Sequence, residues 1–260
     1  MRVQMFEKIQ KLFKKEPKVI FQAKMPGIET FMPIIPASSY KPKWLATARS
    51  KYSEKLAGQQ LIDRRYASVH RCPGIIDLMN SGWIVRAWQD FTIETNGDGG
   101  SFKWNASIDS KDYIGNDDIG HMLGHALTDY LPKRIDTLST VIKFNSPWLV
   151  TVPKGWSLLY MPMLYSDDGR FTCCPGILDT EMDKHLNVQL FWHKLNSIEV
   201  IRAGTPLAHL VLMPTRKAMK MEIRPYTNDT PNLLFAETYR LKARYLYDYY
   251  KTSIIPSSKQ

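Results

Sequence analysis

Short runs of β-branched, aromatic and aliphatic residues dominate the chain after about residue 66. Six of them, separated by Pro, Gly, Asn and Asp, have the length and composition of strands: 139–144, 147–153, 156–162, 187–193, 197–203 and 208–214. A further run, turn residues at 96–101 and a second run predict a β-hairpin over residues 83–104. The pattern predicts a mainly β fold, a jelly roll, β-sandwich or barrel.

Helical periodicity appears before and after this region. Residues 42–61 place Trp44, Ala48, Tyr52 and Leu56 on one face of a predicted helix. Four parts are therefore predicted: a basic amphipathic arm at 1–24, a helical segment at 25–65, a β-rich jelly-roll domain at 66–215 and a basic, Tyr-rich helical arm at 216–260.

The two arms carry the excess positive charge of the chain. Of the net +10, residues 1–24 contribute seven basic against two acidic residues, and residues 216–260 contribute nine against four. The 19 basic and 19 acidic residues between them leave the body neutral. The basic character therefore indicates charged arms rather than a body that recognises nucleic acid by sequence.

Apolar residues alternate with this charge at helical spacing in both arms. A helix in the first arm would dock on an acidic partner, lie on a membrane surface or cap its own domain, and these alternatives stay open. In the second arm, Thr230 and Pro231 predict a helix start, and five tyrosines follow between Tyr239 and Tyr250. The predicted interaction residues are Phe6, Ile9, Phe13, Lys14, Lys15, Leu241, Tyr245 and Tyr249.

Cysteine usage and hydropathy limit the cellular setting. The three cysteines, Cys72, Cys173 and Cys174, form no zinc-type pair and favour a reducing compartment. The N-terminus lacks the apolar stretch of a secretory signal, and no run of about 20 apolar residues predicts a membrane span. We expect the chain to stay in the cell that makes it.

The phrase Cys-Pro-Gly-Ile-aliphatic-Asp occurs twice, at residues 72–77 and 174–179. Pro fixes one dihedral angle, Gly permits a positive one, and Asp can bond its own backbone two residues on. Each copy is therefore predicted to form a tight corner at the beginning or end of a strand.

Residues 147–214 resemble the dUTPase family. The matching positions follow that family's order of strands and turns: Pro153, Gly155, Trp156, Gly176, Ile177, Leu178, Asp179, Gly204, Ala208, Leu210, Val211 and Pro214. The resemblance implies a distorted jelly roll of short strands and a trimer.

The catalytic motifs of that family are incomplete in this chain. Asp167 and Asp168 stand where its phosphate-binding segment has donors, and Met182 or Asp183 replaces its stacking tyrosine. The glycine-rich C-terminal motif is absent, so Asp179 alone survives. The resemblance therefore predicts the fold and no catalytic residue.

A wider stretch, most of residues 66–214, resembles an uncharacterised protein family of large contractile-tailed cyanophages. That family brings no activity with it. It implies the setting of an infected host's cytoplasm and then a virion.

Histidines and cysteines offer further candidate chemistry. His121 and His125 stand four residues apart in a predicted helix, where they could share a metal or make core or interface hydrogen bonds. Histidines at 185, 193 and 209 could converge from neighbouring strands as an oxygenase metal site, although the required His-x-Asp/Glu pair is absent. Cys173 and Cys174 are interpreted as a buried pair rather than a nucleophile.

These observations favour a non-enzymatic assembly or virion-associated phage protein. Its β domain is predicted to form a homo-oligomer, a trimer by the family resemblance, and its arms to contact virion proteins with acidic surfaces. No catalytic residue, cofactor or metal is predicted, with His121 and His125 the candidates if a metal is bound. The alternative is an enzyme on a jelly-roll scaffold, either a dUTPase-like nucleotide hydrolase or a metal-dependent oxygenase.

Overall fold

The computed structural model describes residues 18–56, 72–115, 119–121, 131–215, 221–223, 225, 235–236 and 239–240. The chain divides into two compact units. Met1–Ile34 and Ile84–Arg216 form the first unit, and Ile35–Trp83 and Lys217–Gln260 form the second.

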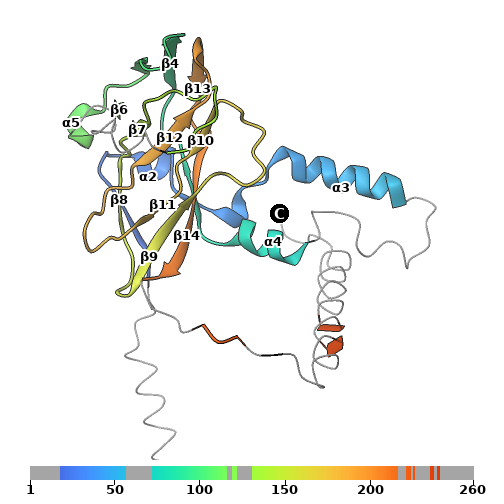
Figure 1. Ribbon diagram of the computed structural model, residues 1–260. Helices are drawn as coiled ribbons and strands as arrows, with labels where there is room; N and C mark the ends of the chain where they lie inside the picture. The colour runs from blue at the N-terminus through green and yellow to red at the C-terminus, as the bar shows by residue number, and fades with distance from the viewer. Residues whose placement is uncertain are drawn as a thin grey trace, which may run out of the picture. The chain divides into compact units, whose positions relative to one another are not determined.

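The first unit contains nearly all of the strands (Figure 1). They are β1 (Ile20–Ala23), β3 (Trp83–Arg86, of which Ile84–Arg86 belong to this unit), β4 (Phe91–Asn96), β5 (Lys103–Ala106), β6 (Ile119–His121), β7 (Ile142–Phe144), β8 (Trp148–Thr151), β9 (Trp156–Met161), β10 (Phe171–Cys173), β11 (Gly176–Leu178), β12 (Val188–Trp192), β13 (Asn196–Ile201) and β14 (Pro206–Pro214). Two helices of four residues each, α2 (Ile28–Phe31) and α5 (Lys111–Ile114), belong to the same unit.

These strands pair into several sheets. One contains the strands β11-β9-β14-β3 in that order, a second has the order β10-β12-β7-β6, a third β13-β4-β5, and β1 pairs with β8. The pairings with a defined register are antiparallel, and β4 alternates buried and solvent-facing residues along its length. Such alternation is expected of strands that cover a core on one side.

Aromatic side chains fill the core of the first unit. The Phe91 ring meets Trp88 and Phe144 edge to face, at centroid distances of 4.8 and 5.1 Å. Trp192 is fully buried and stacks on Phe171 at 6.3 Å. The predicted mainly β fold, a jelly-roll type of β-sandwich, is confirmed, and the six predicted strand runs form β7, β8, β9, β12, β13 and β14.

The predicted hairpin over residues 83–104 is only half right. β4 and β5 form its antiparallel part, and the turn between them is held by Asp98, whose Oδ1 accepts hydrogen bonds from the amides of Gly100 and Ser101, each at 2.8 Å. The first run, however, breaks into β3 and β4, which join different sheets. The break occurs because the backbone of Ala87 bonds to Thr205 O and Gly204 N instead of continuing a ladder.

The repeated phrase adopts two different structures, so the prediction of a strand corner is wrong for the first copy. Pro73 there begins helix α4 (Pro73–Asn80), because proline suits the first helical turn and the following aliphatic residues have helical spacing. In the second copy, Gly176–Leu178 forms β11, which pairs with β9 from Tyr160 to Leu158. The second copy therefore forms a strand rather than a helix because it pairs with β9, which is distant in the sequence.

The described helices of the second unit are α3 (Lys43–Leu56), α4 and the 3-10 turn η1 (Ala37–Ser39), and strand β2 (Ile35–Pro36) precedes them. Trp44, Ala48 and Tyr52 are half-buried at four-residue spacing, so the predicted helix is confirmed over Lys43–Leu56 and its predicted face is confirmed at these three residues. The remainder of the prediction, residues 57–61, lies outside the described residues.

None of the described helices has the length and apolar character that a membrane crossing requires.

Candidate functional site

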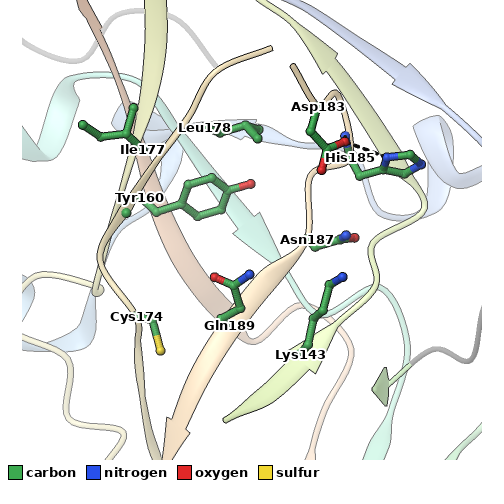
Figure 2. A pocket seen from close by; sticks show the side chains of 10 residues that line it. Lys143, Tyr160, Cys174, Ile177, Leu178, Asp183, His185, Asn187 and Gln189 are labelled. Carbon is green, nitrogen blue, oxygen red and sulfur yellow. Dashed lines mark hydrogen bonds and ion pairs between the residues drawn. The ribbon is translucent and has the colours of Figure 1, made fainter. Parts of the chain in front are cut away.

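A polar cavity of about 150 Å³ opens where β9 and β11 lie near β7 and β12 (Figure 2). Its lining comes from four strands and the loop before β12: Lys143, Tyr160, Cys174, Gly176, Ile177, Leu178, Asp183, His185, Asn187 and Gln189. All of these residues belong to the first unit.

Tyr160 lines this cavity with a hydroxyl group that lacks a partner. The residue is 8% exposed, and its Oη is buried without a hydrogen bond. Burial raises the pKa of this phenol, and the nearby Cys173 and Asp183 raise it further, so the hydroxyl stays neutral. Figure 2 shows the hydroxyl pointing away from β9 toward the side of the cavity that holds Asp183 and Asn187. A buried unpaired hydroxyl is costly, and a ligand that bonds to it would remove that cost.

The opposite wall carries amide and ammonium groups. Lys143 on β7 and Gln189 on β12 are direct cross-strand partners, and Asn187 stands two residues before Gln189 on the same side. The Asn187 Oδ1 accepts a hydrogen bond from Ser146 N at 3.2 Å, which directs its side-chain NH₂ elsewhere. This wall therefore presents mostly hydrogen-bond donors.

Asp183 and His185 are joined by hydrogen bonds on the exposed side of the cavity. Asp183 Oδ1 accepts hydrogen bonds from His185 N at 2.9 Å and from Nδ1 at 2.8 Å. Burial works against ionisation of Asp183, but these hydrogen bonds and the charges of His185 and Lys143 together lower the pKa of the carboxyl. The carboxylate thus stays charged and engaged with its own loop.

The two adjacent cysteines are not activated. Cys173 is buried and Cys174 is half-buried, and burial raises the pKa of both thiols to about 12. A nucleophilic cysteine needs a lowered pKa. The interpretation of these residues as a buried pair therefore holds for Cys173 but not for Cys174, which is half-buried and lines the cavity.

Asp179, the surviving motif residue, lines a second cavity of about 120 Å³ with Ser157, Ile177, Met213, Pro214 and Thr215. Its Oδ1 accepts a hydrogen bond from Glu181 N at 3.0 Å, and its carbonyl accepts two more from Met182 N and Asp183 N. This is the turn role that an aspartate after a strand commonly has.

Asp168, one of the two aspartates at the position of the phosphate-binding segment, is part of a structural ion pair. Its carboxylate receives Arg170 Nε at 2.9 Å and Nη2 at 2.7 Å, and Arg170 Nη1 also donates to Val200 O. The bidentate contact fixes the Arg170 side chain within the loop before β10. The bond to Val200 O then ties this loop to β13.

The three histidines of the strand region do not converge. His185 is hydrogen-bonded to the exposed Asp183, whereas His193 is buried with its ring nitrogens 2.9 Å from Thr137 Oγ1 and 2.8 Å from Thr172 Oγ1. His209 is buried within β14. Among the residues that the structure describes, no three His, Cys, Asp or Glu side chains gather as metal ligands would.

His193 is expected to make stability depend on pH near neutrality. Burial lowers its pKa first, and the charge of Arg134 lowers it further, so the unfolded chain binds a proton more readily than the folded one. The neutral His193 ring therefore contributes fully to the free energy of unfolding above the unfolded-state pKa of about 6.5. This contribution is lost as the pH falls below that value. Urea midpoints measured from pH 8 to pH 5 should fall for the wild type. The His193→Gln variant should show a shallower fall, and an equal slope in both proteins would contradict this role.

The helical spacing predicted for His121 and His125 is wrong for His121, which ends strand β6. Register with β7 places His121 opposite Ile142, so pairing between distant segments overrides the local helical pattern. His125 lies outside the described residues. So do Phe6, Ile9, Phe13, Lys14, Lys15, Leu241, Tyr245 and Tyr249, and their interaction roles stay predictions.

One side of the β11-β9-β14 sheet carries hydrophobic side chains at its accessible positions, and the polar residues that register places on the same side, Ser157 and His209, are buried. Register places Ile177, Leu159 and Val211 in one cross-strand row. Strand alternation adds one methionine from each of two strands to the same side. We call these five residues the apolar sheet face: Leu159, Met161, Ile177, Val211 and Met213. Ile177 is 62% exposed and the other four are half-buried.

The corresponding row of the β13-β4-β5 sheet is different. There Ile198 stands opposite Glu94, which stands opposite Lys103. This row mixes charge with one exposed isoleucine, as expected for a solvated surface. The contrast marks the apolar sheet face as the candidate interface.

Comparisons with known proteins leave the family open. No protein-family model matches the chain, and no curated protein matches it either. Among solved structures, a mutant dUTPase from phage phi11 of S. aureus is 10% identical over 56% of this chain and 84% of its own, with a TM-score of 0.32. A mutant dUTPase of the 80alpha phage is 12% identical over 56% and 84%, with a TM-score of 0.29. These values do not assign the chain to a family.

Proposed function

We propose that this chain is a non-enzymatic assembly protein of a phage particle, which binds further copies of itself through the apolar sheet face. The observation that carries the proposal is the uncharged row Ile177, Leu159 and Val211 on β11, β9 and β14. Hydrophobic side chains grouped in this way contribute free energy when a partner removes them from water.

A second copy of the same chain is the partner that suits this surface. Homo-oligomer interfaces are more apolar and poorer in charge than ordinary protein surface, and a patch without charge is compatible with itself. β11, which contains the exposed Ile177, is also the edge strand of this sheet among the described residues. A trimer is the stoichiometry suggested by the sequence resemblance over residues 147–214.

The charged ends supply the second half of the proposal. Each end carries a net charge of +5 beside a neutral middle, so each would be attracted to an acidic surface. The proposed neighbours are virion proteins with acidic surfaces. The proposed setting is the host cytoplasm during infection and then the particle.

The mass of the native protein in solution tests the proposed self-association. Light scattering over a range of protein concentrations should give a homo-oligomer, and for a trimer a mass three times 30.1 kDa. A mass of 30.1 kDa at every concentration would remove the basis of the proposal.

The nucleotide hydrolase remains a second candidate because Asp179 lines a cavity beside β9 and β14. The assembly proposal predicts that dUTP with Mg²⁺ gives no saturable rise in the melting temperature. A saturable rise that disappears in Asp179→Asn would instead support a hydrolase, since a ligand that binds the folded state raises its stability. Metal analysis of the same sample tests the oxygenase alternative.

A further inference from the structure

The geometry points to a binding site for a small monocarboxylate in the cavity between Tyr160, Lys143, Asn187 and Gln189. This inference does not rest on self-association: Ile177 borders both the cavity and the apolar sheet face, but none of the four residues argued here belongs to that face. Figure 2 shows these four side chains projecting from separate strands and the loop before β12 toward a shared space.

The buried hydroxyl of Tyr160 is the observation that indicates a ligand. Its Oη is enclosed, has no hydrogen-bond partner and belongs to a residue that lines the cavity. Folded proteins rarely leave such a group unsatisfied. An acceptor oxygen placed in the cavity would receive this hydrogen bond.

The charge of the lining selects an anion with a single negative charge. Lys143 supplies one cation, and the amide groups of Asn187 and Gln189 supply further donors. Asp183 adds a negative charge at the same cavity, paired with His185. The lining offers no cation beyond Lys143 to compensate a second negative charge, and a doubly charged phosphate costs more to desolvate than a carboxylate, so the carboxylate is the better match to these donors.

Size and apolar surface narrow the ligand further. A cavity of about 150 Å³ is the size that accommodates a molecule such as benzene, so the space suits a short-chain acid rather than a nucleotide. Leu178 and the ring of Tyr160 also line the cavity and offer apolar contact to a short carbon chain. Propionate and butyrate have these dimensions and are the probes of choice.

The test measures thermal stability of the full chain with sodium propionate, against sodium chloride at equal ionic strength. Propionate should raise the melting temperature in a saturable way, with a dissociation constant in the millimolar range, about 1–10 mM, as expected for so few ligand atoms. Inorganic phosphate at the same concentration should raise it less.

Two variants separate binding from folding. Lys143→Met should weaken propionate binding by at least about tenfold, because a charged hydrogen-bond donor is lost. Lys103→Met, on β5 of a different sheet, should bind as the wild type does. Tyr160→Phe should raise the melting temperature without ligand by about 1–3 °C, since the unpaired hydroxyl is removed, and should also weaken binding.

The inference is overturned if propionate and butyrate produce no saturable shift in the wild-type protein. It is equally overturned if Lys143→Met binds propionate as tightly as the wild type, or if phosphate binds better than both acids. If Lys143→Met does not fold, saturation-transfer NMR on the methyl protons of propionate replaces it, with the wild type and Tyr160→Phe compared. A signal in the wild type that is weaker in Tyr160→Phe supports the site, and an equal signal or none overturns it. None of these outcomes depends on the oligomeric mass, so failure here and failure of the assembly proposal remain distinct.

Discussion

Replacing Phe91 with alanine is expected to lower the free energy of unfolding by about 3–5 kcal/mol, the range measured for buried aromatic residues. Phe91 is 0% exposed and touches Trp88 and Phe144 edge to face. The variant therefore loses apolar burial and two aromatic contacts, and leaves a cavity that its rigid neighbours cannot fill. Equilibrium urea unfolding measures the change.

Phe31→Ala is the matched control, because the same side chain is 80% exposed at the end of α2. Its effect should stay within about 0.5 kcal/mol, as for most surface substitutions. Similar losses in both variants would contradict the core described around Phe91.

Replacing Ile177 with lysine is expected to weaken self-association by at least about tenfold, because the interface would then have to desolvate an ammonium group among apolar side chains. Ile177 is 62% exposed in the single chain, so the folded monomer should tolerate the charge. Sedimentation velocity at several concentrations gives the dissociation constants of the two proteins.

Ile198→Lys provides the comparison. Ile198 is also an isoleucine within a strand, is 68% exposed and stands opposite Glu94 in the charged row. This substitution should leave self-association unchanged. An equal effect at both positions, or no effect at Ile177, would place the interface elsewhere.

Local composition was enough to predict much of the fold. The six predicted strand runs contain alternating or continuous apolar residues bounded by turn residues, and each became a strand. The helix from Lys43 was predictable for the same reason, since Trp44, Ala48 and Tyr52 repeat every four residues. Each of these signals lies within the segment that it describes, so no information about distant partners was needed.

Elements that depend on distant partners were missed. β1 is a strand because Ile20–Ala23 pairs with β8, and β10 because Phe171–Cys173 pairs with β12, but neither run is long enough to predict a strand by itself. The helical spacing of His121 and His125 within residues 117–131 predicts a helix, whereas pairing with β7 makes His121 part of a strand. The two copies of Cys-Pro-Gly-Ile likewise diverge because only the second lies beside β9.

The polar cavity could not be predicted from spacing. Lys143, Tyr160 and Gln189 come from three strands separated by connections of different length, and none belongs to a motif. One signal was available within the predicted strands: Lys143 and Gln189 interrupt otherwise apolar runs. Polar residues within predicted strands are therefore worth testing as cross-strand neighbours, since two of them on adjacent strands can line the same site.

Methionine oxidation read by mass spectrometry tests the proposed interface most directly. Met161 and Met213 belong to the apolar sheet face, whereas Met221 is 85% exposed and lies outside it. The full-length protein is treated with dilute hydrogen peroxide at concentrations above and below its dissociation constant. The account predicts that Met161 and Met213 are protected only at the higher concentration, while Met221 reacts equally at both. Equal oxidation of Met161 and Met213 at both concentrations would contradict self-association through this face.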